Sequence, residues 1–251
     1  MPYYFQNDII EKMKLKFFLL QAVLLLSPAL LLAQAQNDTQ PTHSVFMTPI
    51  YNTGNGFDPY QLAFEFGYTY ESEKATALAA GFLGEEDYQF TAQGIWWPFR
   101  WSKGRMGLGA KYNFTYFQEL SITNNILAGF WLETQPVSWF SLKVNTVSLY
   151  KMRTIFAIRD TNPVLTNLTM GFDFALHFYP FYWYEFYTAI RTHELFRYNL
   201  LGSPALCAGS VFHLSALQEL GAEARVRYTD FFTNSAMFDS CEFALRLRWF
   251  F

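Results

Sequence analysis

Large apolar side chains alternate with small or polar ones along most of this chain. The last ten residues, Glu242–Phe251, place apolar side chains at every second position and charged or small ones between them. Leu168–Phe178 shows the same period. A period of two is typical of a β-strand whose two faces meet different surroundings. Ten such strands are predicted, at Tyr60–Tyr70, Tyr88–Trp97, Met106–Phe117, Asn125–Glu133, Phe140–Tyr150, Leu168–Phe178, Tyr184–Arg191, Ala205–Leu214, Leu220–Tyr228 and Glu242–Phe251.

Two further segments, Ser44–Tyr51 and Ala75–Leu83, raise the count to twelve. Ala75–Leu83 lies between polar clusters at 71–74 and 84–87, which are typical of turns. Twelve is an even number, which places both ends of the strand set on the same side. Ten strands would leave a first loop of sixteen residues, 44–59. We favour twelve and keep ten as the alternative.

The alternating strands have the length that a tilted strand needs to cross a bilayer, about 9–11 residues. The chain is 51% hydrophobic and only 16% charged, but its mean hydropathy of +0.04 is too low for a bundle of membrane helices. In hydrocarbon every backbone group must be paired, so strands there must close on themselves. The predicted fold is therefore all-β: a closed, antiparallel, up-and-down transmembrane β-barrel over residues 44–251. Its apolar face contacts lipid and its mixed face lines the lumen.

The only continuous apolar stretch lies near the start. Lys14 and Lys16 precede an apolar run from Phe17 to Leu32, and Ala33-Gln34-Ala35 follows. This order is typical of a secretory signal peptide, so residues 1–35 are predicted to be one. Residues 1–12 precede a second candidate start at Met13, which leaves a shorter chain as an alternative. Residues 36–43 are polar and are predicted to be a flexible lead-in.

The connections between strands differ in length at the two ends. Longer loops are expected at 151–167, 192–204 and 229–237, with 119–123 as a short exception at the same end, and shorter turns are expected at the opposite end. Indole favours a membrane–water boundary because it is apolar but carries one N–H. All tryptophans fall at or beside the short-turn end, which predicts an aromatic girdle there, formed by Trp96, Trp97, Trp101, Trp131, Trp139, Trp183 and Trp249.

With a signal peptide, period-two strands and a final strand that ends in Phe, the chain resembles bacterial outer-membrane β-barrel proteins. In that class a terminal aromatic residue after alternating apolar positions resembles the signal that the barrel-insertion machinery reads. The residues that match are Phe243, Leu245, Leu247, Trp249 and Phe251, although the class more often has Tyr where this chain has Trp249. The resemblance implies a location in the bacterial outer membrane, with outer-membrane lipid and the insertion machinery as partners.

Strand parity places many charged residues on the lumen face. Because buried charges must be paired, we interpret them first as a structural ion-pair ladder, with Arg225 and Arg246 facing Glu223 and Glu242. The alternative is a basic track that guides small anionic solutes through a narrow pore, as in twelve-stranded channels for acidic oligosaccharides. The predicted lumen charges are Glu65, Lys111, Asp173, Glu185, Arg191, Glu223, Arg225, Arg227, Glu242, Arg246 and Arg248.

Two groups of residues suggest hydrolytic chemistry. His213-Leu214-Ser215 resembles the His-x-Ser of outer-membrane lipid A deacylases, with Glu219 or Glu223 as a third member. It lies at the predicted periplasmic end, however, whereas lipid A lies in the outer leaflet. A second group, at the outer mouth, would resemble the acidic residues and His of outer-membrane proteases: His193, Glu194, Asp230 and Asp239.

The sequence gives little support to other functional classes. Without residues 1–35 the chain keeps 15 of its 18 basic and 19 of its 21 acidic residues, a net charge of −4, which argues against nucleic-acid binding. No phosphate-binding loop, metal cluster or cofactor motif is found. Cys207 and Cys241 lie on non-neighbouring predicted strands, which disfavours a disulfide.

The sequence thus predicts a narrow outer-membrane channel or transporter for small solutes. A structural or surface-interaction barrel with a plugged lumen is the alternative, and a lipid A or peptide hydrolase is the third hypothesis.

Overall fold

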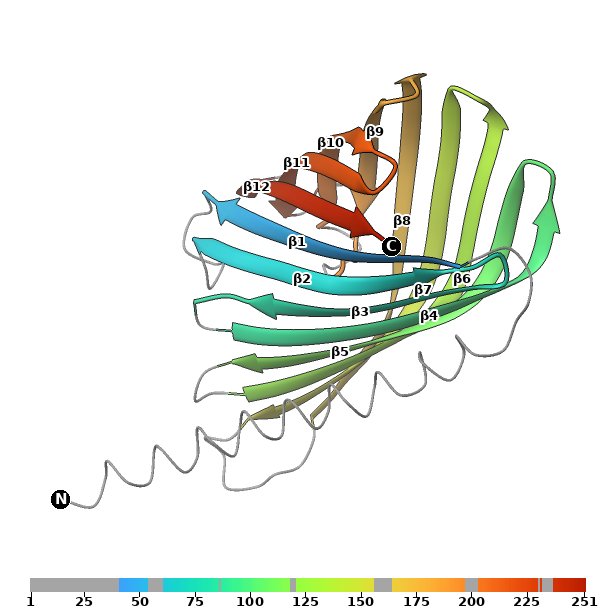
Figure 1. Ribbon diagram of the computed structural model, residues 1–251. Helices are drawn as coiled ribbons and strands as arrows, with labels where there is room; N and C mark the ends of the chain where they lie inside the picture. The colour runs from blue at the N-terminus through green and yellow to red at the C-terminus, as the bar shows by residue number, and fades with distance from the viewer. Residues whose placement is uncertain are drawn as a thin grey trace. The chain divides into compact units, whose positions relative to one another are not determined.

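A computed structural model shows twelve antiparallel strands that close into one barrel (Figure 1). It describes residues 41–53, 61–85, 87–117, 121–155, 164–196, 203–229, 231 and 237–251. Among these residues, no helix is long and apolar enough to cross a membrane. The strands are β1 (Thr42–Asn52), β2 (Leu62–Glu71), β3 (Ala75–Leu83), β4 (Asp87–Trp101), β5 (Gly104–Phe117), β6 (Ser121–Val137), β7 (Phe140–Ile155), β8 (Val164–Phe181), β9 (Tyr184–Arg191), β10 (Ala205–Ser215), β11 (Gln218–Thr229) and β12 (Met237–Phe250).

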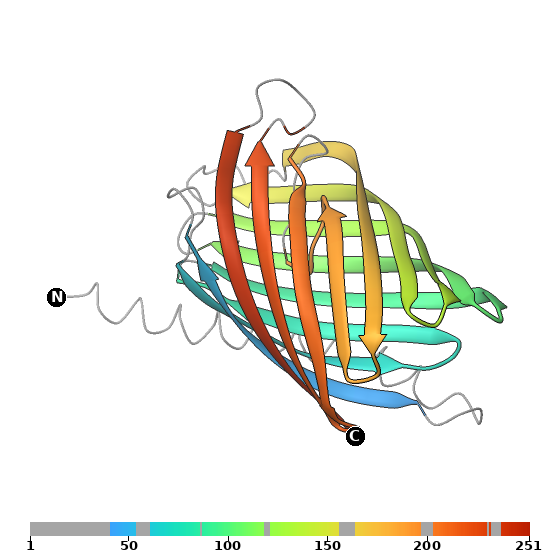
Figure 2. The same ribbon diagram turned by 90° about the horizontal axis from the view of Figure 1, so that it is seen from above.

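Each strand pairs with its neighbours in sequence, and the ring closes where β12 pairs with β1. Figure 2 shows this closure as the red strand β12 beside the blue strand β1. The predicted fold class and the count of twelve strands are confirmed. The predicted signal peptide, residues 1–35, lies outside the described residues. Residues 42 and 43 belong to β1 rather than to the predicted lead-in.

The final strand shows how the alternation positions side chains. Phe243 and Leu245 are 51% and 55% exposed on the outer face, whereas the Glu242 side chain is fully buried in the lumen. The same alternation runs along β1, where Val45 and Met47 point outward. Apolar side chains therefore cover the outside of the barrel, which is the surface that lipid solvates.

The two ends of the barrel differ, although three residues are also enough to join β3 to β4 and β5 to β6 at the long-loop end. Two- or three-residue turns join β2 to β3, β4 to β5, β6 to β7, β8 to β9 and β10 to β11, at the end where β12 terminates (Figure 1). The predicted loop 151–167 is shorter than expected, because β7 continues to Ile155 and β8 begins at Val164. Backbone pairing continues here without the strict alternation that a membrane imposes. The hydrophobic periodicity therefore underestimates the length of β7 and β8.

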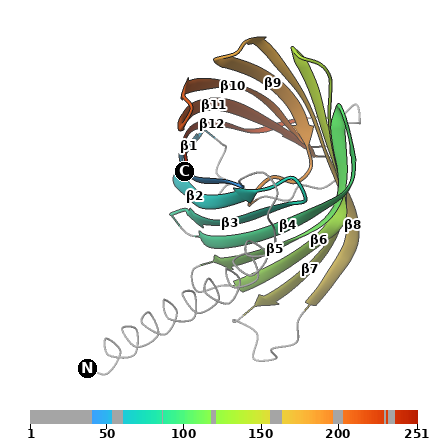
Figure 3. The same cartoon turned by 45° about the vertical axis from the view of Figure 1, so that its right-hand side comes forward.

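The lumen contains apolar clusters as well as polar groups. Phe46, Ile50 and Phe82 form one cluster with residues from several strands. A second cluster joins Trp97 and Trp131 to their neighbours on β4, β6 and β7. Figure 3 gives an oblique view of the wall of strands. A barrel of this size is filled largely by its own side chains.

Candidate functional site in the barrel lumen

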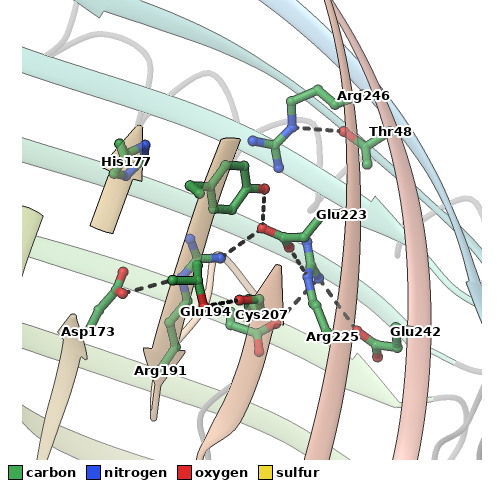
Figure 4. A network of polar contacts seen from close by, with 12 residues as sticks. Thr48, Asp173, His177, Arg191, Glu194, Cys207, Glu223, Arg225, Glu242 and Arg246 are labelled. Atoms are coloured by element: carbon green, nitrogen blue, oxygen red, sulfur yellow. Dashed lines mark hydrogen bonds and ion pairs between the residues drawn. The ribbon is translucent and has the colours of Figure 1, made fainter. Parts of the chain in front are cut away.

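Each predicted lumen charge makes an ion pair or a charged hydrogen bond inside the barrel. The densest cluster lies between β8, β9, β11 and β12 (Figure 4). Arg191 joins two acids in it, with its Nε 3.2 Å from Asp173 Oδ1 and its Nη1 3.1 Å from Glu223 Oε2. Tyr187 also donates its hydroxyl to Glu223. These contacts link an acid of β8 and an acid of β11 through side chains of β9.

The predicted pairing of the last two strands is found for one arginine and not for the other. Arg225 contacts both Glu223 and Glu242, as the ladder predicts. Arg246 instead donates to Thr48 Oγ1 at 3.2 Å and lies 3.6 Å from Glu65. The reason is barrel closure. Pairing of β12 with β1 brings Arg246 toward β1 and β2, strands at the opposite end of the sequence.

The largest departure from the sequence prediction is the segment Thr192–Phe196, which we call the inner segment. It was expected to begin an outer loop, 192–204. Thr192, His193, Glu194 and Phe196 are instead all buried, and their partners come from the lumen walls. A loop segment that folds inward in this way fills the lumen between the strands.

Backbone groups of the inner segment bond to side chains of several strands. Lys111 on β5 donates to the carbonyl oxygen of Glu194. Thr91 on β4 donates to the carbonyl oxygen of Leu195 at 3.1 Å. Gly171 on β8 leaves room for the segment, since a Cβ atom there would lie 3.0 Å from Thr192 Oγ1. The segment is therefore positioned by tertiary contacts with strands distant in sequence.

An apolar contact holds the far end of the inner segment. The Phe196 ring lies 5.4 Å from the Phe82 ring, centroid to centroid, and belongs to the cluster that contains Phe46 and Ile50. Burying a Phe side chain stabilises this position of the segment by roughly 2–3 kcal/mol. The contact holds the inner segment without any charge pairing.

The Glu194 carboxylate reaches the two arginines of β11. Its Oε2 atom lies 3.0 Å from Arg227 Nη2 and 3.3 Å from Arg225 Nη1. Arg227 Nη2 also donates to Glu242 Oε2 at 3.1 Å. The pairing is incomplete, because Glu194 Oε1 and Arg227 Nε and Nη1 have no hydrogen-bond partner among the described residues.

The two ionisable groups of the inner segment have shifted pKa values. Burial and the nearby Lys111 cation lower the pKa of His193 to about 3, so its imidazole is neutral at pH 7. Burial raises the pKa of Glu194, but Arg227 and Arg225 together bring it below its ordinary value. The carboxylate is therefore charged when it pairs with the arginines.

The short-turn end of the lumen is open. A cavity of about 650 Å³ lies there, bounded partly by Glu71, Arg105, Glu133 and Lys143. Arg105 pairs with both Glu71 and Glu133 and lies 4.2 Å above the Trp97 ring. The open end therefore presents charged side chains of both signs to solvent.

The structure does not assemble the predicted lipid A deacylase site. His213 Nδ1 lies 2.9 Å from Glu219 Oε1, but Ser215 accepts a hydrogen bond from the Leu217 backbone in an exposed turn. A register irregularity between His213 and Ser215 interrupts the shared face. Glu223, the other proposed member, lies in the arginine network.

The predicted protease-like group at the outer mouth is not assembled either. His193 and Glu194 are buried in the lumen, and Asp239 lies partly buried on β12. Asp230 lies outside the described residues. Within the described ranges, no three His, Cys, Asp or Glu residues are placed to hold a metal ion, and both cysteines are free thiols.

Two of the tryptophans predicted to form the aromatic girdle do not lie on the outer face. Trp97 and Trp131 are buried in the lumen, so those two assignments are wrong. Their strand parity is the signal that places them there, because each lies one position away from an outward-facing residue. The other members are exposed near the short-turn end: Trp96, Trp101, Trp139, Trp183 and Trp249.

Comparison with known proteins confirms the architecture. No family model and no curated protein matches the chain. The barrel is similar to the KdgM porin in complex with disordered oligogalacturonate, with a TM-score of 0.58 and 5% identity over 83% of this chain and 99% of that one. It is also similar to the NanC porin, with a TM-score of 0.55 and 7% identity over 82% and 98%. At these identities the likeness concerns the fold, and the fold is that of the bacterial outer-membrane β-barrels.

Proposed function

We propose that this protein spans the bacterial outer membrane as a narrow channel for small solutes, and that the inner segment closes it in the state described here. The observation that carries this proposal is a charged lumen obstructed by a segment that belongs to no strand. Ionisable residues at membrane depth are costly and typically line solute or ion pathways. A barrel needing only stability would gain from an apolar filling, because replacing buried ion pairs by apolar residues is often neutral or stabilising.

Small anionic solutes are the proposed cargo. The arginine network supports this choice, since strands β9, β11 and β12 all contribute guanidinium groups to the lumen. The open cavity at the short-turn end supplies further cations, including Arg105 and Lys143. The matched porin whose structure contains oligogalacturonate is compatible with such a cargo.

The test is conductance of the refolded protein in planar bilayers. Wild type is expected to show rare, small unitary currents. A variant with Thr192–Phe196 replaced by five glycine and serine residues is expected to show frequent currents of larger amplitude. Heat-modifiable mobility on a gel establishes that each preparation is a folded barrel. If the replaced variant folds but passes no current, the channel proposal fails.

The filled lumen specifically favours one other candidate, a structural or surface-interaction barrel whose lumen stays closed. In that case the inner segment is a permanent filling. Its replacement would then reduce the stability of the barrel without producing unitary currents, so the same experiment separates the two functions.

A further inference from the structure

We infer that Arg225 and Arg227 form a carboxylate-binding site for the permeating solute, and that Glu194 occupies this site in the solute's place when the channel is closed. This inference rests on the proposed channel function and adds the chemistry that opens it. The site consists of two guanidinium groups from alternate positions of β11, both buried, with the Glu194 carboxylate between them.

Glu194 makes fewer hydrogen bonds to the two arginines than a carboxylate in this site could make. A single oxygen, Oε2, contacts both arginines, while Oε1 and two nitrogen atoms of Arg227 remain without partners among the described residues. Guanidinium and carboxylate groups pair most strongly in a two-point, parallel arrangement. A carboxylate that is not tethered to the chain can adopt that arrangement, so it can compete with Glu194.

The formal charges of the network indicate that one anion must remain. Among the residues that the structure describes, the cations of this network are Lys111, Arg191, Arg225, Arg227 and Arg246, and the acids are Glu65, Asp173, Glu194, Glu223 and Glu242. Withdrawal of Glu194 alone leaves one formal positive charge in excess. An uncompensated buried charge is costly, so the vacated site favours a monoanion over a neutral solute.

The tether sets the concentration at which a solute can compete. Glu194 lies three residues after the end of β9, and a short flexible tether corresponds to an effective concentration in the millimolar range. A carboxylate-bearing solute at similar concentrations can therefore displace it. Phe196 remains the second contact that returns the segment to the lumen.

Sodium glucuronate and glucose provide a matched pair of probes, because they have similar size and only one has a carboxylate. In bilayers, about 10 mM glucuronate is expected to raise the open probability of wild type about threefold or more, whereas glucose leaves it unchanged. Glu194→Gln is expected to be open without glucuronate and to respond little to it. Glu85→Gln, the same change at an exposed turn residue, should behave as wild type.

Direct titration of the refolded protein in detergent measures the site independently of current. Glu194→Gln should bind glucuronate about tenfold more tightly than wild type, because the internal competitor is weakened. Adding Arg227→Gln to that variant should abolish the gain. Equal affinities of wild type and Glu194→Gln, with a conducting Glu194→Gln, would overturn the inference but leave the channel function standing. Tighter binding without current in any variant would overturn the channel function and leave the carboxylate site.

Discussion

The two halves of the lumen are built by the same twelve strands, yet they differ in what fills them. Near the long loops, the inner segment and the arginine network occupy the interior. Near the short turns, a cavity of about 650 Å³ remains. The strand alternation is similar in both halves. The difference therefore comes from a connecting segment, and it shows that wall pattern alone does not determine whether a barrel lumen is open.

Ion pairs illustrate the same difference. Arg225 is buried among three carboxylates, whereas Arg248 is partly exposed and lies 3.6 Å from Glu219. The ion pairs of Arg225 are shielded from water. Solvent weakens the ion pair of Arg248.

The largest expected effect comes from removing the buried cation. Arg225→Met leaves Glu194, Glu223 and Glu242 with fewer partners and should lower the free energy of unfolding by about 4 kcal/mol. Arg248→Met, at the open end, should lower it by less than about 1 kcal/mol. Urea unfolding in lipid vesicles, followed by tryptophan fluorescence, measures both. Equal losses would show that the two halves do not differ in shielding.

A change of pH should open the filled half. The pKa of His193 is lowered to about 3 in the closed state, so as pH falls below about 6.5 a displaced His193 binds a proton that the closed state does not. The closed state loses stability as the pH falls, by about 2 kcal/mol at pH 5, or roughly 30-fold in the closed–open equilibrium.

Open probability measured at pH 7 and pH 5 tests this prediction. The charged groups around His193 are Lys111, Arg191 and Glu194. His193→Gln should remove the response. His213→Gln, in the open half, should retain it. A response that persists in His193→Gln would assign the effect to another group.

The smallest expected effect is steric. Gly171→Ala places a Cβ atom 3.0 Å from Thr192 Oγ1 and 3.2 Å from His193 Nδ1. This crowding should weaken the closed state by about 1 kcal/mol and raise the open probability about fivefold. Gly94→Ala is the control, because no atom lies within 4 Å of its Cβ position. The same increase in both variants would contradict a role for Gly171 in seating the inner segment.

The alternation of residues along a strand is enough to predict part of the lumen lining. Parity alone places Glu65, Glu223 and Glu242 inside, because lipid excludes unpaired charge from the outer face. The partner of Arg246 could not be found in this way, since it depends on the contact between the first and last strands. Position along the strand predicts a girdle site for Trp97 and Trp131, but strand parity places both side chains in the lumen. The insertion signal at Phe243–Phe251 and the proposed partners remain predictions.

By itself, the sequence determined the barrel and the face that meets lipid, and it favoured twelve strands over ten. These features follow from backbone pairing and from alternation, both of which repeat locally along the chain. Only the tertiary structure decided that Thr192–Phe196 lies inside and that Glu194 meets Arg225 and Arg227. The segment has no strand period to read, and its contacts lie on β4, β5, β8 and β11 as well as on the Phe82 ring of β3. Its position is therefore set by side chains that only the closed barrel brings together.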